Sequence, residues 1–259
     1  MHYQVVVPSY DRSVVCHHKT LATLRRFGVD ADLVTVFVAS EDEKERYDAE
    51  FSGNWRTVVA ELGVFRARRF INGYFKEGTQ LLSLDDDIDE ILQKDGNRCV
   101  PYTGTIDDLA VDGFSQCASA GARLWGVYPA ANGLFMNDYT VLGLRLVCGA
   151  LYGSFAGDDV FLGERSLHSS GEDIETTLRS FVAYQKIVRL EYLTYRTKYF
   201  ARGGIDAELN NQGVDRASDN TARLHEIAAR FPSLTSTYLK AGGVTNIKFK
   251  NITQAKIPR

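Results

Sequence analysis

Length, composition and charge place the chain among ordinary globular proteins. Its 259 residues are 44% hydrophobic and 24% charged, which allows one α/β domain with a sizeable core. The net charge of −3 argues against a protein that holds nucleic acid mainly through its phosphates, because such proteins are usually basic. We find no linker or repeat, and therefore expect a single domain over residues 1–259.

The N-terminus and the cysteines predict a soluble, cytoplasmic protein. The first four residues lead straight into an apolar strand, without a basic region or a cleavage site. No apolar run approaches the roughly 20 residues of a membrane span, so we expect no membrane association. The cysteines form no CxxC pair, so we expect reduced, mostly buried thiols rather than a zinc site. They are Cys16, Cys99, Cys117 and Cys148.

The first hundred residues alternate apolar runs with helical patterns. In chain order these are a strand at 3–7, a helix at 19–27, a strand at 33–39, a helix-prone acidic run at 41–47, a helix at 65–77 and a strand at 80–84. Gly28 and Gly78 supply helix stops. This rhythm predicts a Rossmann-like, mostly parallel sheet with helices on both faces.

The second half is less regular, although its elements can still be placed. We expect a helix at 106–120, a strand at 123–128 and sheet with tight turns at 139–152. A helix should run from Gly171 to about Tyr184, followed by a strand at 186–193, a loop at 201–213 and a last helix at 221–230. The basic tail from Lys248 to Arg259 could touch nucleic acid, but a frayed, solvated tail is the expectation.

Three consecutive carboxylates, Asp85, Asp86 and Asp87, follow the strand at 80–84. Ligands of parallel sheets bind beyond the carboxyl ends of the strands, so we expect Pro8-Ser9-Tyr10-Asp11-Arg12 and Ser40-Glu41 to share a crevice with them. Adjacent carboxylates repel one another unless solvent or a cation intervenes, and Mg²⁺ and Mn²⁺ take oxygen ligands. In extended backbone Asp85 and Asp87 would point one way and Asp86 the other. The alternative is a solvated turn that caps a short helix at 88–92.

Other polar residues allow a functional and an ordinary interpretation. Glu172 and Asp173 open a helix, where acids suit the helix dipole, but Asp173 could also be a general base. Arg68 could reach a diphosphate, or belong with Arg66 and Arg69 to a solvated basic face. The pair His17-His18 is expected to splay apart and to make a poor chelate. His168 could line the acceptor pocket, although a surface histidine is the expectation, and nothing near His225 favours a third metal ligand there.

Together these motifs resemble GT-A type glycosyltransferases, over roughly the first 195 residues. More narrowly, VPSYDR, VTVFVASEDE, RRFINGYFKEG and LLSLDDDID are similar to the phage TET-associated glycosyltransferases. Members of that family are implied to add a sugar to 5-hydroxymethylpyrimidines, such as 5-hydroxymethylcytosine, in viral DNA. The resemblance implies a GT-A-like fold, a nucleotide-sugar donor such as a UDP-sugar, Mn²⁺ or Mg²⁺ as cofactor, and hydroxymethylated DNA in the host cytoplasm as acceptor.

The resemblance also implies roles for particular residues. Residues 1–100 would form the nucleotide-sugar-binding half, and residues 101–259 the acceptor-binding half and tail. The nucleotide contacts would be Pro8, Ser9, Tyr10, Arg12 and Ser40, the phosphate contact Arg68, the metal ligands Asp85 and Asp87, the ribose contact Asp86, and the catalytic pair Glu172 and Asp173, with Asp173 as base. Arg69 departs from the asparagine that often follows the arginine in GT-A families.

Other functions stay open at the level of sequence. A GT-A enzyme could instead use a small-molecule, glycan or protein acceptor, and the sequence does not fix the stereochemistry or the oligomeric state. A metal-dependent phosphotransferase or nuclease would use the aspartates differently. A haloacid-dehalogenase-like phosphatase carries its DxD motif after the first strand, whereas here the aspartates follow a later one. The sequence contains no paired-histidine nuclease motif. A non-catalytic binding protein would have the same sheet but would use the acidic crevice for another purpose.

Overall fold

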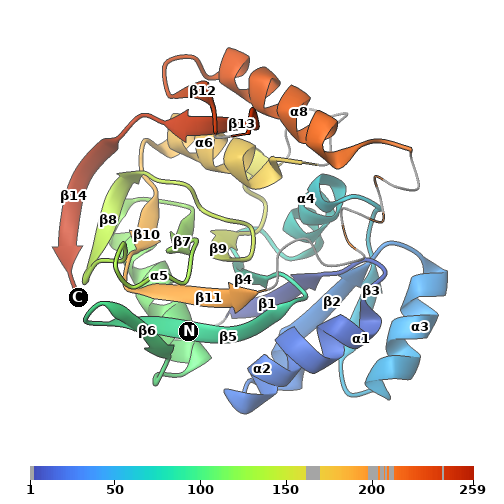
Figure 1. Ribbon diagram of the computed structural model, residues 1–259. Coiled ribbons are helices and arrows are strands. Elements are labelled where there is room, and N and C mark those ends of the chain that lie inside the picture. The colour runs from blue at the N-terminus through green and yellow to red at the C-terminus, as the bar shows by residue number, and fades with distance from the viewer. Residues whose placement is uncertain are drawn as a thin grey trace.

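A computed structural model shows a large central sheet flanked by helices (Figure 1). It describes residues 3–161, 170–197, 204, 207, 209, 213–240 and 242–259. Nine strands form the main sheet in the order β14-β8-β10-β7-β9-β4-β1-β2-β3 among these residues. The strands are β1 (Tyr3–Pro8), β2 (Val34–Val38), β3 (Arg56–Val59), β4 (Gln80–Leu84), β7 (Trp125–Val127), β8 (Tyr139–Leu144), β9 (Leu151–Phe155), β10 (Val188–Leu190) and β14 (Ile252–Pro258).

The N-terminal half of the sheet is parallel, as the sequence predicts. Strands β3, β2, β1 and β4 pair in parallel, and β9 then runs antiparallel to both of its neighbours, β4 and β7. Strand β10 is parallel to β7, whereas β8 and β14 are antiparallel to their partners. The carboxyl ends of β1, β2 and β4 therefore meet at one edge of the sheet, which is where such sheets bind ligands.

Helices cover both faces of the sheet, because the strands are apolar on both sides. In β1, Val5 and Val7 pack into a core shared with the helices of one face, whereas Val6 packs with Ile71 on the opposite face. Such uninterrupted apolar strands are typical of a sheet buried on both sides. The α-helices are α1 (Ser13–Cys16), α2 (Ala22–Arg26), α3 (Glu41–Phe51), α4 (Val64–Tyr74), α5 (Ile106–Ala120), α6 (Glu172–Tyr184) and α8 (Arg216–Arg230).

Local capping signals explain the best predicted helix. In α5, Thr105 and Asp108 form a capping box, and Gly121 ends the helix in the left-handed conformation. Helix α6 begins at Glu172 as expected, whereas α4 ends at Tyr74, three residues before the predicted end at residue 77.

The first helical segment departs from the prediction. A π-helical turn, His17–Leu21, joins α1 to α2, so the helix begins before residue 19. The expectation that His17 and His18 splay apart is wrong. Their rings stack with centroids 5.1 Å apart, because consecutive side chains diverge less in the wider π turn.

Two smaller sheets complete the fold, and the strand pairing of the whole structure corrects three predictions. One consists of β11 (Leu193–Thr197), β5 (Ile88–Asp95) and β6 (Arg98–Pro101), so residues 88–92 form a strand and not a short helix. The predicted strand at 186–193 divides between β10 and β11. The tail is not frayed, since β14 pairs with β8 and Lys256 Nζ lies 4.8 Å from the ring centre of Tyr139.

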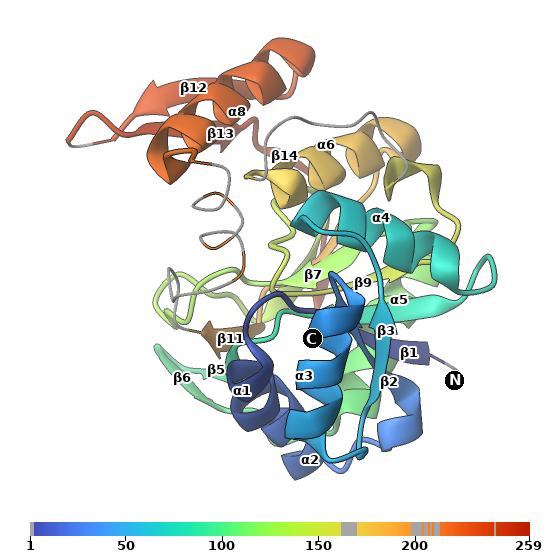
Figure 2. The same cartoon turned by 90° about the vertical axis from the view of Figure 1, so that its right-hand side faces the viewer.

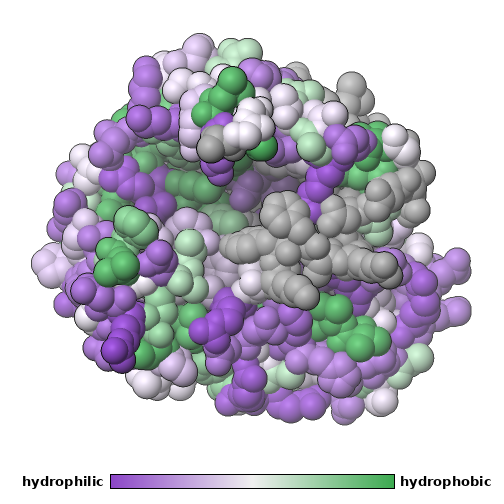
Figure 3. All heavy atoms as spheres, viewed as in Figure 1, coloured by the Kyte–Doolittle hydropathy of each residue, from purple (hydrophilic) through white to green (hydrophobic). Residues whose placement is uncertain are grey.

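The third sheet is a hairpin of β12 (Thr235–Leu239) and β13 (Thr245–Phe249). Figure 2 shows that hairpin and α8 as an outer layer beyond α6, with α1, α2 and α3 at the opposite end of the molecule. On the face drawn in Figure 3, hydrophilic side chains predominate and hydrophobic ones gather in small, separate patches. No helix of the described residues combines the length and apolar character that crossing a membrane requires.

All four cysteines carry free thiols, and Cys16 and Cys117 are buried. Cys99 and Cys148 are partly exposed, so two of the four thiols are buried. His168 and most of the predicted loop at 201–213 lie outside the described residues.

Candidate active site

A cavity of about 740 Å³ opens at the carboxyl edge of the parallel strands. It brings together nearly all of the residues that the sequence singles out. Those in its lining are Pro8, Ser9, Tyr10, Arg12, Arg68, Asp85, Asp86, Asp87, Glu172 and Asp173. Ser40 lies outside that lining, and its hydroxyl instead caps α3 by accepting a hydrogen bond from the backbone N–H of Glu43 at 3.2 Å. A nucleotide contact by Ser40 stays a prediction.

The three aspartates follow β4 in a turn that the π-helical segment holds in place. The hydroxyl of Thr20 donates to the carbonyl of Asp85 at 2.6 Å and accepts from the backbone N–H of Ile88 at 2.9 Å. Because Asp86 and Asp87 lie in a turn, the strand alternation expected for the triplet does not apply to them.

Arg12 links the second and third aspartates. Its Nη1 lies 3.1 Å from Asp86 Oδ1 and 3.3 Å from Asp87 Oδ2. Ser9 Oγ donates to Asp86 Oδ2 at 2.5 Å, and Thr197 Oγ1 donates to Asp87 Oδ1 at 2.5 Å. Burial raises the pKa of Asp86 to about 6, although Arg12 and Ser9 act against the shift.

Sequence reasoning missed two residues of this group, Tyr47 and Thr197. The phenol of Tyr47 is buried, lies 2.7 Å from Ser9 Oγ and accepts from the backbone N–H of Arg12 at 3.0 Å. A sequence signal for Tyr47 existed. Glu43, Tyr47 and Phe51 recur every four residues in a highly charged helix, and all three are buried.

Arg68 joins the first aspartate to the start of α6. Its guanidinium lies 3.0 Å from Asp85 Oδ1 and 3.1 Å from Glu172 Oε1, and it donates to the carbonyl of Gly149 at 2.9 Å. Burial lowers the pKa of Arg68, but the electrostatic interactions with Glu172, Tyr152 and Asp85 raise it by more. The net shift of the pKa is therefore upward, and Glu172 contributes most to the rise. A side chain at Gly149 would collide with this group, since a Cβ there would lie 2.6 Å from the guanidinium nitrogens.

The pKa values of two carboxyl groups beside Arg68 are raised. Burial raises the pKa of Asp85 to about 7, with Arg68 opposing and the other two aspartates adding to the shift. Burial likewise raises the pKa of Glu172 to about 8, with Arg68 opposing and Asp173 adding. A cation that entered the cavity would displace protons from such groups, because ligation requires the carboxylate form.

The donor set suits a hard divalent cation. Asp85 and Asp87 offer carboxylate oxygens on the cavity wall, and Mg²⁺ and Mn²⁺ commonly take one or two carboxylates together with substrate phosphates. Among the described residues, the aspartates do not form a cluster of three or more ligands within 4.8 Å of one another. As far as the described residues go, water and phosphate oxygens would supply the remaining ligands.

Asp173 and Glu172 differ in how they are engaged. Glu172 is buried and bound to Arg68, whereas Asp173 is partly exposed at the cavity. Asp173 accepts from the backbone N–H groups of Gly149 at 3.4 Å and Ile174 at 2.8 Å. Both donors to Asp173 are thus backbone groups, whereas the partner of Glu172 is a guanidinium.

Solved structures with the same fold contain a metal with UDP-glucose or UDP. Glucosyl-3-phosphoglycerate synthase from Mycobacterium tuberculosis, in complex with Mn²⁺, UDP-glucose and phosphoglyceric acid, matches with a TM-score of 0.52 and 12% identity, over 99% of this chain and 89% of that chain. The same enzyme with Mg²⁺ and UDP matches with a TM-score of 0.51 and 14% identity, over 99% and 90%. The chain has a GT-A-like fold, as expected from the sequence.

A further match is TarS residues 1–349 from S. aureus, with a TM-score of 0.49 and 15% identity. That match covers 75% of this chain and 59% of the TarS chain. No protein-family model and no curated protein sequence matches the chain significantly.

Proposed function

We propose that the chain is a metal-dependent glycosyltransferase that takes its sugar from a nucleotide sugar, most simply a UDP-sugar. One observation carries the proposal. The acidic turn after β4 and the Glu172–Asp173 start of α6 converge on one cavity of about 740 Å³, at the edge where a GT-A-like sheet binds its ligands. A cavity of this size is ample for a nucleotide sugar, since ligand pockets commonly measure ~300–1,000 Å³.

Asp85 and Asp87 would hold Mn²⁺ or Mg²⁺, which when bound neutralises charge on the leaving nucleoside diphosphate. Arg12 and Arg68, which pair with the aspartates, add fixed positive charge to the cavity wall. Glu172 positions Arg68 through the ion pair at 3.1 Å.

Asp173 is the proposed base. The acceptor's hydroxyl oxygen attacks the anomeric carbon, the bond from that carbon to the diphosphate oxygen breaks, and the diphosphate leaves with the electron pair. Asp173 takes the hydroxyl proton in this step. Its partial exposure and its contacts with backbone N–H groups favour it over Glu172, which is buried and occupied by Arg68.

For the acceptor we propose the hydroxymethyl group of a modified pyrimidine in DNA. The support is the resemblance of the motifs VPSYDR and LLSLDDDID to enzymes with that substrate class. A base in duplex DNA would have to turn out of the stack to reach the cavity, since its hydroxymethyl group must approach Asp173. Residues of α8 and of the C-terminal hairpin, including Asn220 and Val244, line the same cavity and offer a surface for the acceptor.

The test is mass spectrometry of DNA after incubation with the protein, Mn²⁺ and a panel of UDP-sugars. We expect a mass increase of one hexose or related sugar on 5-hydroxymethylcytosine DNA, and none on unmodified DNA. The Asp87→Ala variant should not modify the DNA. If the protein hydrolyses or transfers from UDP-sugars but leaves hydroxymethylated DNA unchanged, the DNA acceptor is wrong and the glycosyltransferase class stands. If it uses none of the donors, both are wrong.

A further inference from the structure

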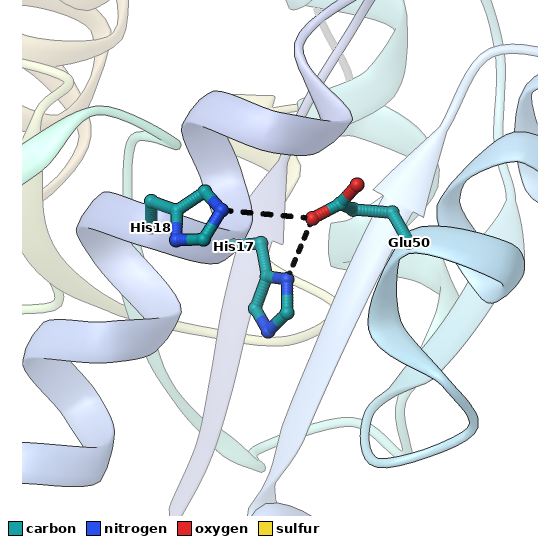
Figure 4. A group of neighbouring side chains, drawn as sticks. All are labelled: His17, His18 and Glu50. Atoms are coloured by element: carbon teal, nitrogen blue, oxygen red, sulfur yellow. Dashed lines mark hydrogen bonds and ion pairs between the residues drawn. The ribbon is translucent and has the colours of Figure 1, made fainter.

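A second cluster of metal-ligating side chains lies away from the cavity, between the π-helical turn and the end of α3 (Figure 4). His17 and His18 come from the π turn, and Glu50 comes from α3. Figure 4 shows both imidazoles directed at the same carboxylate oxygen. His17 Nδ1 lies 2.8 Å from Glu50 Oε1, and His18 Nε2 lies 3.9 Å from it. None of the three residues lines the cavity.

The three ligand atoms match the spacing of a tetrahedral transition-metal site. Zinc bonds of about 2.0–2.1 Å to nitrogen and oxygen place neighbouring tetrahedral ligands roughly 3.4 Å apart. The observed separations from Glu50 Oε1, 2.8 and 3.9 Å, lie on either side of that value, and all three ligand atoms are within 4.8 Å of one another. A shift of roughly half an ångström at the exposed His18 side chain would bring its nitrogen to that spacing, since exposed side chains change rotamer readily.

A simple ion pair explains the position of His17 but not that of His18. His17 is at hydrogen-bond distance from Glu50, and a single His–Glu pair would be complete without a second histidine. The His18 side chain is 70% exposed, yet its ring stacks on that of His17 at an interplanar angle of 24° and presents Nε2 to the same oxygen. Two imidazoles and one carboxylate leave a fourth position that water can fill, which is a donor set suited to Zn²⁺, Ni²⁺ or Cu²⁺.

We propose that His17, His18 and Glu50 bind a transition-metal ion of the zinc class, at a site separate from the aspartate cavity. The bound ion would cross-link the π turn to α3. The same turn carries Thr20, whose hydroxyl holds the backbone of the aspartate turn at Asp85 and Ile88. A bound metal ion would therefore make the π turn, and with it the aspartate turn that Thr20 holds, more rigid. The ion would contribute no ligand to the candidate active site. This inference does not depend on the proposed function.

The test is calorimetric titration of the chelator-treated, full-length protein with ZnCl₂ in excess Mg²⁺. Magnesium competes at carboxylate sites but poorly at imidazole. We expect one Zn²⁺ per chain, with the affinity reduced at least about tenfold in His18→Ala and in Glu50→Gln, because each substitution removes one of three protein ligands. Substitution of His17 is avoided, since its ring also packs on Phe51 with centroids 5.6 Å apart.

Two control variants locate the site. His225→Ala removes an exposed histidine of α8, and Asp87→Ala removes a carboxylate of the cavity; both should keep the Zn²⁺ affinity of the parent protein. Replacing Zn²⁺ by Co²⁺ should give the visible absorption of a four-coordinate site in the parent protein and not in His18→Ala. Zinc binding that is absent, that His18→Ala and Glu50→Gln leave unchanged, or that Asp87→Ala abolishes would overturn the proposal. Circular dichroism of each variant excludes loss of folding as the cause.

Discussion

Replacing Arg68 with methionine should cost about 3–5 kcal/mol of the free energy of unfolding, the usual penalty for removing one partner of a buried ion pair. The side chain of Arg68 is only 7% exposed. Its loss would leave the buried carboxylate of Glu172 and the carbonyl of Gly149 without their guanidinium partner. Asp85 should contribute less to the penalty, because 38% of its side chain is exposed to solvent.

The penalty should also depend on pH and on Glu172. Without Arg68 the pKa of Glu172 rises further, since Arg68 is the group that lowers it, so protonation at low pH relieves the unpaired charge. The loss should therefore be larger at pH 9 than at pH 6. In the double variant Arg68→Met/Glu172→Gln part of the stability should return, with a coupling of roughly 0.5–3 kcal/mol.

Urea unfolding followed by tryptophan fluorescence measures these differences. Arg66→Met is the matched control, because Arg66 lies on the same helix and is exposed, and its substitution should change stability by less than about 0.5 kcal/mol. A loss of under about 1 kcal/mol in Arg68→Met, or strict additivity in the double variant, would refute the account of Arg68 as a buried bridge between two carboxylates.

Three further outcomes concern the acidic groups of the cavity. Calorimetry should show Mn²⁺ affinity about tenfold higher at pH 8 than at pH 6, because the metal must displace the proton of Asp85, whose pKa is raised to about 7; equal affinities would contradict this. Thermal unfolding without metal should show stability falling as pH rises from the ordinary glutamate pKa of 4.5 to about 8, since a raised folded-state pKa favours the folded protein only while the group is protonated. Glu172→Gln should make the decline of stability with pH less steep. If the decline is as steep as in the parent protein, Glu172 is not the group that causes it. Asp173→Asn should lower kcat by about 10²–10⁴-fold with donor binding intact, and near-parental kcat would remove Asp173 as the base.

Local signals made the parallel half of the fold predictable from the sequence. Strand β2 is buried along its whole length, and its mostly apolar, β-branched sequence is typical of a strand covered on both faces. The capping residues Thr105 and Gly121 bracket α5. The general rule that ligands bind beyond the strand ends predicted that the three aspartates after β4 would line the cavity.

Non-local pairing set the features that the sequence did not reveal. Residues 88–92 become a strand because they pair with β11, where Tyr195 lies opposite Ile91, and no local pattern announces that partner. The contact of Arg68 with Glu172 likewise joins two helices, α4 and α6, that lie far apart in the sequence. The stacked pair His17-His18 depends on a π turn, which shifts the direction of side chains relative to the α-helix assumed from sequence.

The most direct test of the central claim is calorimetric titration of the protein with UDP-glucose, with and without Mn²⁺. We propose that a cation held by Asp85 and Asp87 binds the diphosphate of the donor. Mn²⁺ should therefore strengthen UDP-glucose binding by at least about tenfold, and Asp87→Ala should abolish this gain. Equal affinity with and without Mn²⁺, or an undiminished Mn²⁺ effect in Asp87→Ala, would contradict it.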